Sequence, residues 1–160
     1  MTINQAIRLA EKMMKVHNEL RYWKVTFNKR KRAFGVCNYS KRQIELSTYL
    51  VPAMSDDAIK DTITHEIAHA LTRGHGHDNV WKMKCIELGG NGQRCGGSDH
   101  YKDGQAGQMI IQEKLAKYTL ACPCCGTKYY KNRKPTRSVS CGKHSGVYDP
   151  KYKFIITQNY

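Results

Sequence analysis

The chain has 160 residues, 40% of them hydrophobic, which suits one domain alone or one domain with a small appended module. No apolar run approaches the roughly 20 residues of a membrane span and the first residues lack the apolar stretch of a secretory signal, so we expect a cytoplasmic protein, with association to the nucleoid left open. The net charge of +14 favours a polyanionic partner, most often nucleic acid, although solubility alone would also account for it.

The first part of the chain predicts one helix followed by three strands. Thr2 is a good N-cap, and apolar residues recur after it at helical spacing through about His17. Three segments that alternate in polarity and are rich in aromatic and β-branched residues indicate strands; they are 22–28, 33–39 and 42–47. We expect the basic residues 29–32 to form the tip of a hairpin between the first two strands.

Two further helices are predicted from their end signals. Ser55 can cap a helix whose first turn carries two acids, which suit the helix dipole, and which stops at Gly74. Asp78 can cap the next helix, which ends at Gly89. We therefore expect an α+β core in which helices pack on a small antiparallel sheet.

The remaining sequence predicts a connection and a second module. Residues 96–117 begin with a Gly-rich polar stretch typical of a linker or long loop, and 109–118 is ambiguous between a helix and a strand. Residues 118–160 are rich in cysteine and contain alternating segments. We divide the chain into a core of 1–95, a linker or loop of 96–117 and a C-terminal module of 118–160.

The helix predicted after Ser55 carries a metal-binding pattern, His65-Glu66-Ile67-Ala68-His69. Two histidines four apart project from one face of a helix, so both imidazoles can reach one zinc ion. Zinc lowers the pKa of a bound water to about 7, and a glutamate beside the first ligand can take the proton of that water. The order H-E-x-x-H thus predicts catalytic zinc with Glu66 as general base.

A catalytic zinc needs a third protein ligand and an open position. His75 has the spacing of one class of zinc protease, and Glu87 would suit another class. His77 lies just before the second helix, and two glycines before it let the chain fold back toward the first pair. We favour His77, with His75 as the alternative.

These residues resemble the SprT-like metallopeptidases, a family related to the DNA-dependent protease Spartan. "DTITHEIAHAL" followed by "GHGHDNVW" is similar to the family's zinc site, in which Gly76, His77 and Trp81 match the segment of the third ligand. The resemblance extends from about Ile3 to Tyr152. It implies a zincin-like α+β core, a zinc ribbon after it, and hydrolysis of peptide bonds, often in proteins on DNA.

The cysteines near the C-terminus predict a second metal site. Seven cysteines in a cytoplasmic chain argue against a disulfide framework. Cys122 and Cys125 form C-x-x-C, and Cys141 and His144 form C-x-x-H; together they can hold one structural zinc in a β zinc ribbon. Cys124 could replace Cys122 as a ligand. A module this small buries little apolar surface, so zinc would supply the stability it lacks.

Two basic clusters are candidates for nucleic-acid contact. From Lys114 to the C-terminus there are ten basic residues and one acid. Cations that alternate with aromatic residues suit phosphate contact and base stacking on single or frayed strands, although a solvated hairpin would have the same composition. The candidates are Lys29, Arg30, Lys31, Arg32, Lys128, Tyr129, Lys131, Arg133, Lys134 and Arg137.

The preferred hypothesis is a zinc metalloendopeptidase that processes DNA-associated proteins, including those crosslinked to DNA. It needs one catalytic and one structural Zn²⁺, a protein substrate and a DNA partner, and it involves no membrane. Two alternatives remain: a nucleic-acid-binding zinc protein without proteolytic activity, and a metallopeptidase that does not depend on DNA.

Overall fold

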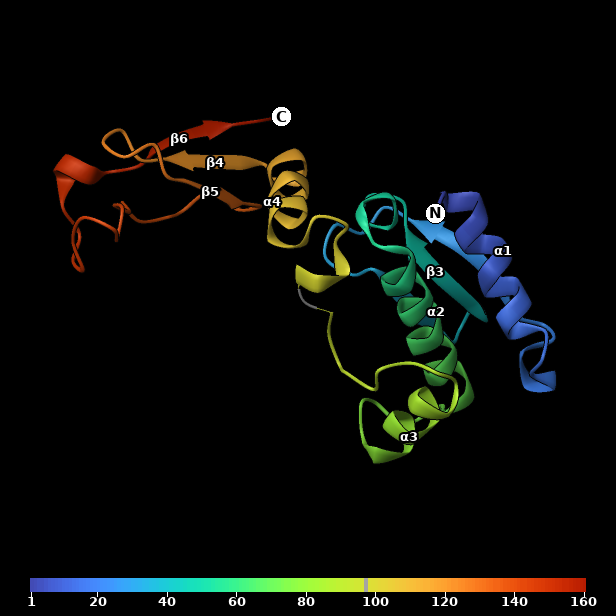
Figure 1. The fold of residues 1–160 in the computed structure, drawn as a ribbon. Helices are drawn as coiled ribbons and strands as arrows, with labels where there is room; N and C mark the ends of the chain where they lie inside the picture. The colour runs from blue at the N-terminus through green and yellow to red at the C-terminus, as the bar shows by residue number, and fades with distance from the viewer. Residues whose placement is uncertain (97) are drawn as a thin grey trace. The chain divides into compact units, whose positions relative to one another are not determined.

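The computed structural model describes residues 1–96 and 98–160. Within them the chain is α+β and forms two compact units, Met1–Gln108 and Met109–Tyr160, described separately here (Figure 1). The described helices include none with both the length and the apolarity that crossing a membrane requires.

Helix α1 (Ile3–Met14) begins as predicted at Thr2. The Thr2 hydroxyl accepts a hydrogen bond from the Gln5 N–H at 3.2 Å, and the Gln5 side chain accepts one from the Thr2 N–H at 2.7 Å. This reciprocal pairing satisfies two backbone donors at the helix start. The helix ends at Met14, a turn before the predicted end, and is followed by a short 3₁₀ turn, η1 (Asn18–Leu20).

The sheet of the first unit is mixed, so the predicted antiparallel sheet is wrong. Its order is β1-β3-β2, with β1 (Lys24–Asn28) parallel and β2 (Gly35–Asn38) antiparallel to β3 (Gln43–Ser47). The central strand carries two fully buried apolar side chains, Ile44 and Leu46. Burial of that pair favours a position for β3 between the other two strands. The alternation of polarity within a strand does not indicate the order of strands in a sheet.

Residues 29–34 therefore do not form the predicted hairpin tip. They cross the end of β3, from one edge of the sheet to the other. The Ser47 hydroxyl donates to the Arg30 carbonyl at 2.6 Å, and the Ser47 N–H donates to the Phe34 carbonyl at 2.9 Å. These bonds from β3 hold the basic connection in place.

Helix α2 (Asp56–Leu71) packs against α1 and the sheet (Figure 1). It begins at the predicted cap, since the Ser55 hydroxyl accepts from the Ala58 N–H at 3.2 Å. Full burial of one aliphatic side chain contributes about 1.5–3 kcal/mol, so the side chains buried at this interface stabilise the unit. Its buried core includes Ala6, Ala10, Met14, Ile44, Leu46, Ile59, Ile63 and Ile67.

Helix α3 (Asn79–Glu87) packs against α2, and the predicted cap Asp78 accepts from the N–H groups of Val80 and Trp81. The segment 96–117 contains a 3₁₀ turn, η3 (Ser98–His100), and helix α4 (Gly104–Leu115). The ambiguous stretch after residue 109 is thus helical to Leu115, and the boundary between the two units falls within α4.

The second unit contains a three-stranded antiparallel sheet in the order β5-β4-β6. Its strands are β4 (Tyr118–Ala121), β5 (Lys128–Lys131) and β6 (Ile155–Gln158). The buried core consists of Leu120, Cys122, Cys141 and Phe154. Two of these four residues are cysteines.

Candidate metal centres

Three imidazoles converge at the C-terminal half of α2. His65 and His69 lie one turn apart on that helix, and His77 comes from the loop before α3. Their Nε2 atoms are 3.1–3.2 Å from one another. A tetrahedral zinc with bonds of about 2.0–2.1 Å places its nitrogen ligands about 3.3–3.4 Å apart. The donor set therefore fits one zinc ion.

Backbone groups orient two of these rings. A ring N–H of His65 donates to the backbone of Gln93, and a ring N–H of His69 donates to the backbone of His75. Because Nε2 faces the other rings, Nδ1 is left to donate to these backbone groups. Such bonds fix the tautomer of a metal ligand. Burial and the neighbouring imidazoles lower the pKa of His65 and of His69 to about 4, so both rings are neutral at pH 7, as ligands must be.

Trp81 packs against all three imidazoles of this cluster. Its side chain is 1% exposed, and its ring lies 4.6–5.1 Å from all three imidazole rings. The indole N–H donates to the His65 carbonyl at 3.5 Å. A rigid aromatic ring against three ligands restricts their rotation and keeps the nitrogens converged.

The structure brings His77 into the cluster and not His75. Nδ1 of His75 lies 2.7 Å from the Asp78 carboxylate, which also caps α3. Gly74 has φ of +93°, a conformation that favours glycine and turns the chain back after α2. Glu87 pairs with Lys84 at 2.7 Å and does not join the imidazoles among the described residues.

Glu66 projects from α2 toward strand β2 and is 7% exposed. A β-carbon added to Gly35 would lie 2.8 Å from Glu66 Cγ and 3.0 Å from Glu66 Oε1, so the absent side chain of Gly35 makes room for the carboxyl group. Burial raises the pKa of Glu66 to about 7, and a hydrogen bond with the Cys37 backbone opposes that shift. A carboxyl group with this pKa can both take and return a proton near neutral pH.

A cavity of about 230 Å³ lies beside Glu66 and His65. Its wall includes His100, which the sequence interpretation gave no role. The His100 ring is 6% exposed, stacks on Phe34 with centroids 5.6 Å apart, and leaves Nδ1 without a hydrogen bond among the described residues. No local pattern marks His100, because only the return of the chain through η3 brings it to the cavity.

The second group lies wholly in the second unit and contains Cys122, Cys125, Cys141 and His144. All four ligand atoms lie within 4.8 Å of one another, and Sγ of Cys125 is 3.8 Å from Sγ of Cys141. A tetrahedral zinc with Zn–S bonds of about 2.3 Å also places its sulfurs about 3.8 Å apart. Cys124 is exposed and outside the group, so the geometry favours Cys122.

Local hydrogen bonds favour the thiolate form and the backbone turn that metal binding by this group requires. The side chain and backbone of Thr127 lower the pKa of Cys125 to about 6, which favours the thiolate that metals bind. Gly126 has φ of +68° and its N–H donates to the Cys122 carbonyl at 3.0 Å. His144 stacks on Tyr152 with ring centroids 4.3 Å apart.

Four of the predicted nucleic-acid contacts meet in the second unit. They line a hollow of about 670 Å³ that also includes Phe154, whose ring meets Tyr129 edge-on with centroids 5.5 Å apart. The four are Tyr129, Lys131, Arg133 and Lys134. Lys128 instead lies 4.0 Å from Glu113, and Arg137 is exposed outside the hollow.

The predicted contacts in the first unit lie on the connection between β1 and β2. Lys29 and Arg30 are exposed, and the ammonium of Lys31 lies 5.7 Å from the centre of the Tyr49 ring. Arg32 lines the cavity beside Glu66. The four cations therefore follow one connection, exposed except at the half-buried Lys31, that leads to the proposed catalytic carboxyl group.

The comparisons with known proteins agree with the first of these centres. A model of the SprT-like family matches residues 3–103, which include the three converging histidines and Glu66 and end before Cys122. No curated protein matches the chain.

Proposed function

The chain belongs to the SprT-like family, and from this premise we propose that it is a zinc-dependent endopeptidase whose centre is formed by His65, His69, His77 and Glu66. The observation that carries the proposal is the convergence of three Nε2 atoms beside a buried carboxyl group. Three histidine ligands leave one position for water or substrate, as catalytic zinc sites do.

Glu66 is the proton carrier in the proposed reaction. Bound zinc would supply Lewis-acid polarisation of the scissile carbonyl and would acidify the attacking water. The Glu66 carboxylate takes the proton of that water and then gives it to the nitrogen of the departing amine. Burial of the carboxyl group, which raises its pKa, favours uptake of that proton.

Strand β2 provides a place for the peptide substrate. It is an edge strand in the order β1-β3-β2, and it packs against α2, which carries the catalytic residues. An extended peptide could pair with the free edge as an additional strand. Because Gly35 at the start of β2 faces Glu66, such a peptide would pass close to the carboxyl group.

We further propose that the substrates are proteins associated with DNA, including proteins crosslinked to it. The hollow in the second unit combines three cations with two aromatic rings, a composition that suits single-stranded nucleic acid. The exposed basic connection 29–32 adds positive charge near Glu66. DNA held by the connection 29–32 would concentrate its bound proteins near the active site.

One assay tests these proposals together. The purified chain is incubated with a DNA-binding protein, with and without single-stranded DNA, and with and without a zinc chelator. We expect cleavage that DNA stimulates and the chelator abolishes. Cleavage that DNA leaves unchanged would indicate a peptidase that does not depend on DNA. DNA binding without cleavage of any protein would indicate a binding protein and contradict the peptidase proposal.

A further inference from the structure

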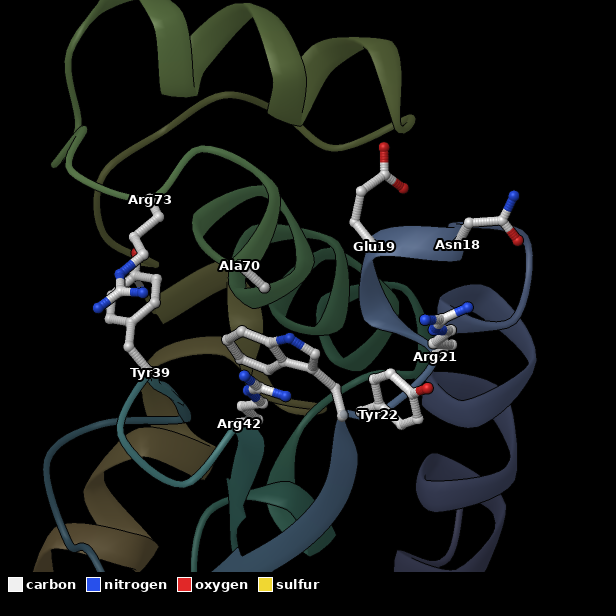
Figure 2. Close-up of a pocket in the computed structure, with 9 residues that line it drawn as sticks. Asn18, Glu19, Arg21, Tyr22, Tyr39, Arg42, Ala70 and Arg73 are labelled. Carbon is white, nitrogen blue, oxygen red and sulfur yellow. The ribbon is translucent and has the colours of Figure 1, made fainter.

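A second pocket on the first unit combines arginines with aromatic rings. It has a volume of about 570 Å³ and shares no lining residue with the cavity beside Glu66. Residues from η1 and its following turn, from the turn between β2 and β3, and from the end of α2 line it (Figure 2). This arginine–aromatic pocket is defined by Arg21, Tyr22, Trp23, Tyr39, Arg42 and Arg73.

The pocket is strongly cationic. Its lining contains three guanidinium groups and a single carboxylate, that of Glu19. Within 1–96 and 98–160, none of the three arginines has an ion-pair partner. Three like charges that form no ion pair favour an anionic ligand, and the planar guanidinium suits phosphate in particular.

Arg42 is held in place by its backbone. Its φ of +51° is the only positive value among the non-glycine residues described, a conformation that costs about 1–2 kcal/mol for an L-residue. Its N–H donates to the Tyr39 carbonyl at 3.3 Å, and its carbonyl accepts from the Lys24 N–H at 3.0 Å. The turn therefore fixes the position from which the Arg42 side chain enters the pocket.

The aromatic rings offer surfaces for stacking. Tyr22 is 63% exposed, with the Arg21 guanidinium 4.5 Å from the centre of its ring. Trp23 and Tyr39 meet edge-on with centroids 6.2 Å apart, and Arg73 lies 5.9 Å from the Tyr39 ring centre. Alternating rings and guanidinium groups suit a ligand that carries both flat bases and phosphates.

We propose that the arginine–aromatic pocket binds a single strand of nucleic acid, with its phosphates on the arginines and a base on the aromatic rings. Figure 2 shows Arg73 and Tyr39 on one side, Arg21 and Tyr22 on the other, and Arg42 between them. Cations on both sides favour a ligand with successive phosphates over a single phosphorylated side chain. The net charge of +14 points to the same polyanion.

The pocket also touches the backbone that holds the metal ligands. The Tyr39 hydroxyl donates to the His69 carbonyl at 2.9 Å, and Ala70 and Arg73 continue the chain that carries His69. A strand in the pocket would therefore lie one hydrogen bond from a proposed zinc ligand. Binding itself does not depend on peptide hydrolysis, so it can be measured in a chain that does not cut.

The test uses the full zinc-loaded chain with Glu66→Gln, which removes the proposed peptidase activity, and a fluorescent oligothymidine of roughly 12 nucleotides. Fluorescence anisotropy over a salt series gives the affinity and its salt slope. The test variants are Arg42→Gln with Arg73→Gln, and Tyr22→Ala, which removes a ring that is mostly exposed to solvent. The control is Lys60→Gln, which removes one positive charge from an exposed position of α2 outside the pocket.

The expected results follow from the chemistry of the contacts. Each lost phosphate contact should reduce the salt slope by about 0.7, so the double arginine variant should show a clearly shallower slope. Tyr22→Ala should weaken binding by about fivefold or more, as loss of one stacked base does. Lys60→Gln should change neither quantity beyond error.

A crosslinking arm distinguishes this pocket from the hollow in the second unit. Oligonucleotides with iododeoxyuridine are irradiated on the chain, and crosslinked peptides are identified by mass spectrometry. Crosslinks at Tyr22, Trp23 or Tyr39 support the proposal. The proposal would be overturned by crosslinks confined to 118–160 or by unchanged binding in both pocket variants. It would also be overturned if a phosphotyrosine peptide or a free nucleotide competed as effectively as the strand.

Discussion

Gly35 on β2 and Glu66 on α2 are in such close contact that a β-carbon on Gly35 would lie 2.8 Å from Glu66 Cγ. The strand that would hold the substrate and the carboxyl group that would move the proton therefore pack without a side chain between them. Any residue larger than glycine at position 35 must displace Glu66 or the strand.

Gly35→Ala should consequently lower catalysis more than zinc binding. A displacement of the general base by about 1 Å can cost on the order of 100-fold in rate, and overpacking costs about 1–3 kcal/mol of stability. We expect a large fall in kcat with two zincs per chain retained, measured by peptide cleavage and by elemental analysis. Gly146→Ala is the matched control, because a β-carbon there meets no atom within 4 Å; equal loss in both variants would contradict this interpretation.

The two histidines near the third-ligand position should behave differently when replaced. His77→Ala removes one of three converging nitrogens and should reduce the zinc content from two ions per chain toward one. His75→Ala removes only a partner of Asp78, so the zinc content should stay at two. If His75→Ala lost zinc and His77→Ala kept it, His75 would be the third ligand and the present assignment would be wrong.

Trp81→Phe should weaken the support of the imidazoles without removing a ligand. The smaller ring leaves part of a buried volume empty and cannot donate to the His65 carbonyl. We expect a loss of about 1–2 kcal/mol in the free energy of unfolding and faster transfer of the catalytic zinc to a chelator. Denaturant unfolding and a chromogenic chelator measure the two effects, and unchanged zinc release would mean that the indole does not orient the ligands.

The cysteines of the second unit give a test of their own. Cys141→Ser removes a buried ligand, and because zinc binding and folding are coupled in small modules, residues 118–160 should become sensitive to protease. Cys124→Ser changes an exposed thiol outside the group, so it should keep its zinc and its protease resistance. Limited proteolysis with mass spectrometry measures both, and the reverse pattern would place Cys124 among the ligands.

Local signals in the sequence predicted much of this structure. Caps at Thr2, Ser55 and Asp78 depend on a few neighbouring residues, and all three are present. The imidazole pair on α2 follows from helix geometry alone. The return of His77 could be inferred because the glycines before it allow a sharp turn.

Long-range pairing explains what the sequence did not predict. The parallel pairing of β1 with β3 depends on which strand occupies the centre of the sheet, and alternation within a strand carries no such information. His100 reaches the cavity beside Glu66 only because η3 returns to α2. The arginine–aromatic pocket likewise combines residues from three distant segments.

The most direct test of the central claim is Glu66→Gln, assayed for zinc content and peptide cleavage in the same preparation. The amide keeps nearly the size of the carboxyl group but cannot accept the proton, so we expect two zincs per chain and a rate lower by about 10²–10⁴-fold. A variant that keeps its zinc and cleaves as fast as the wild type would show that Glu66 is not the general base.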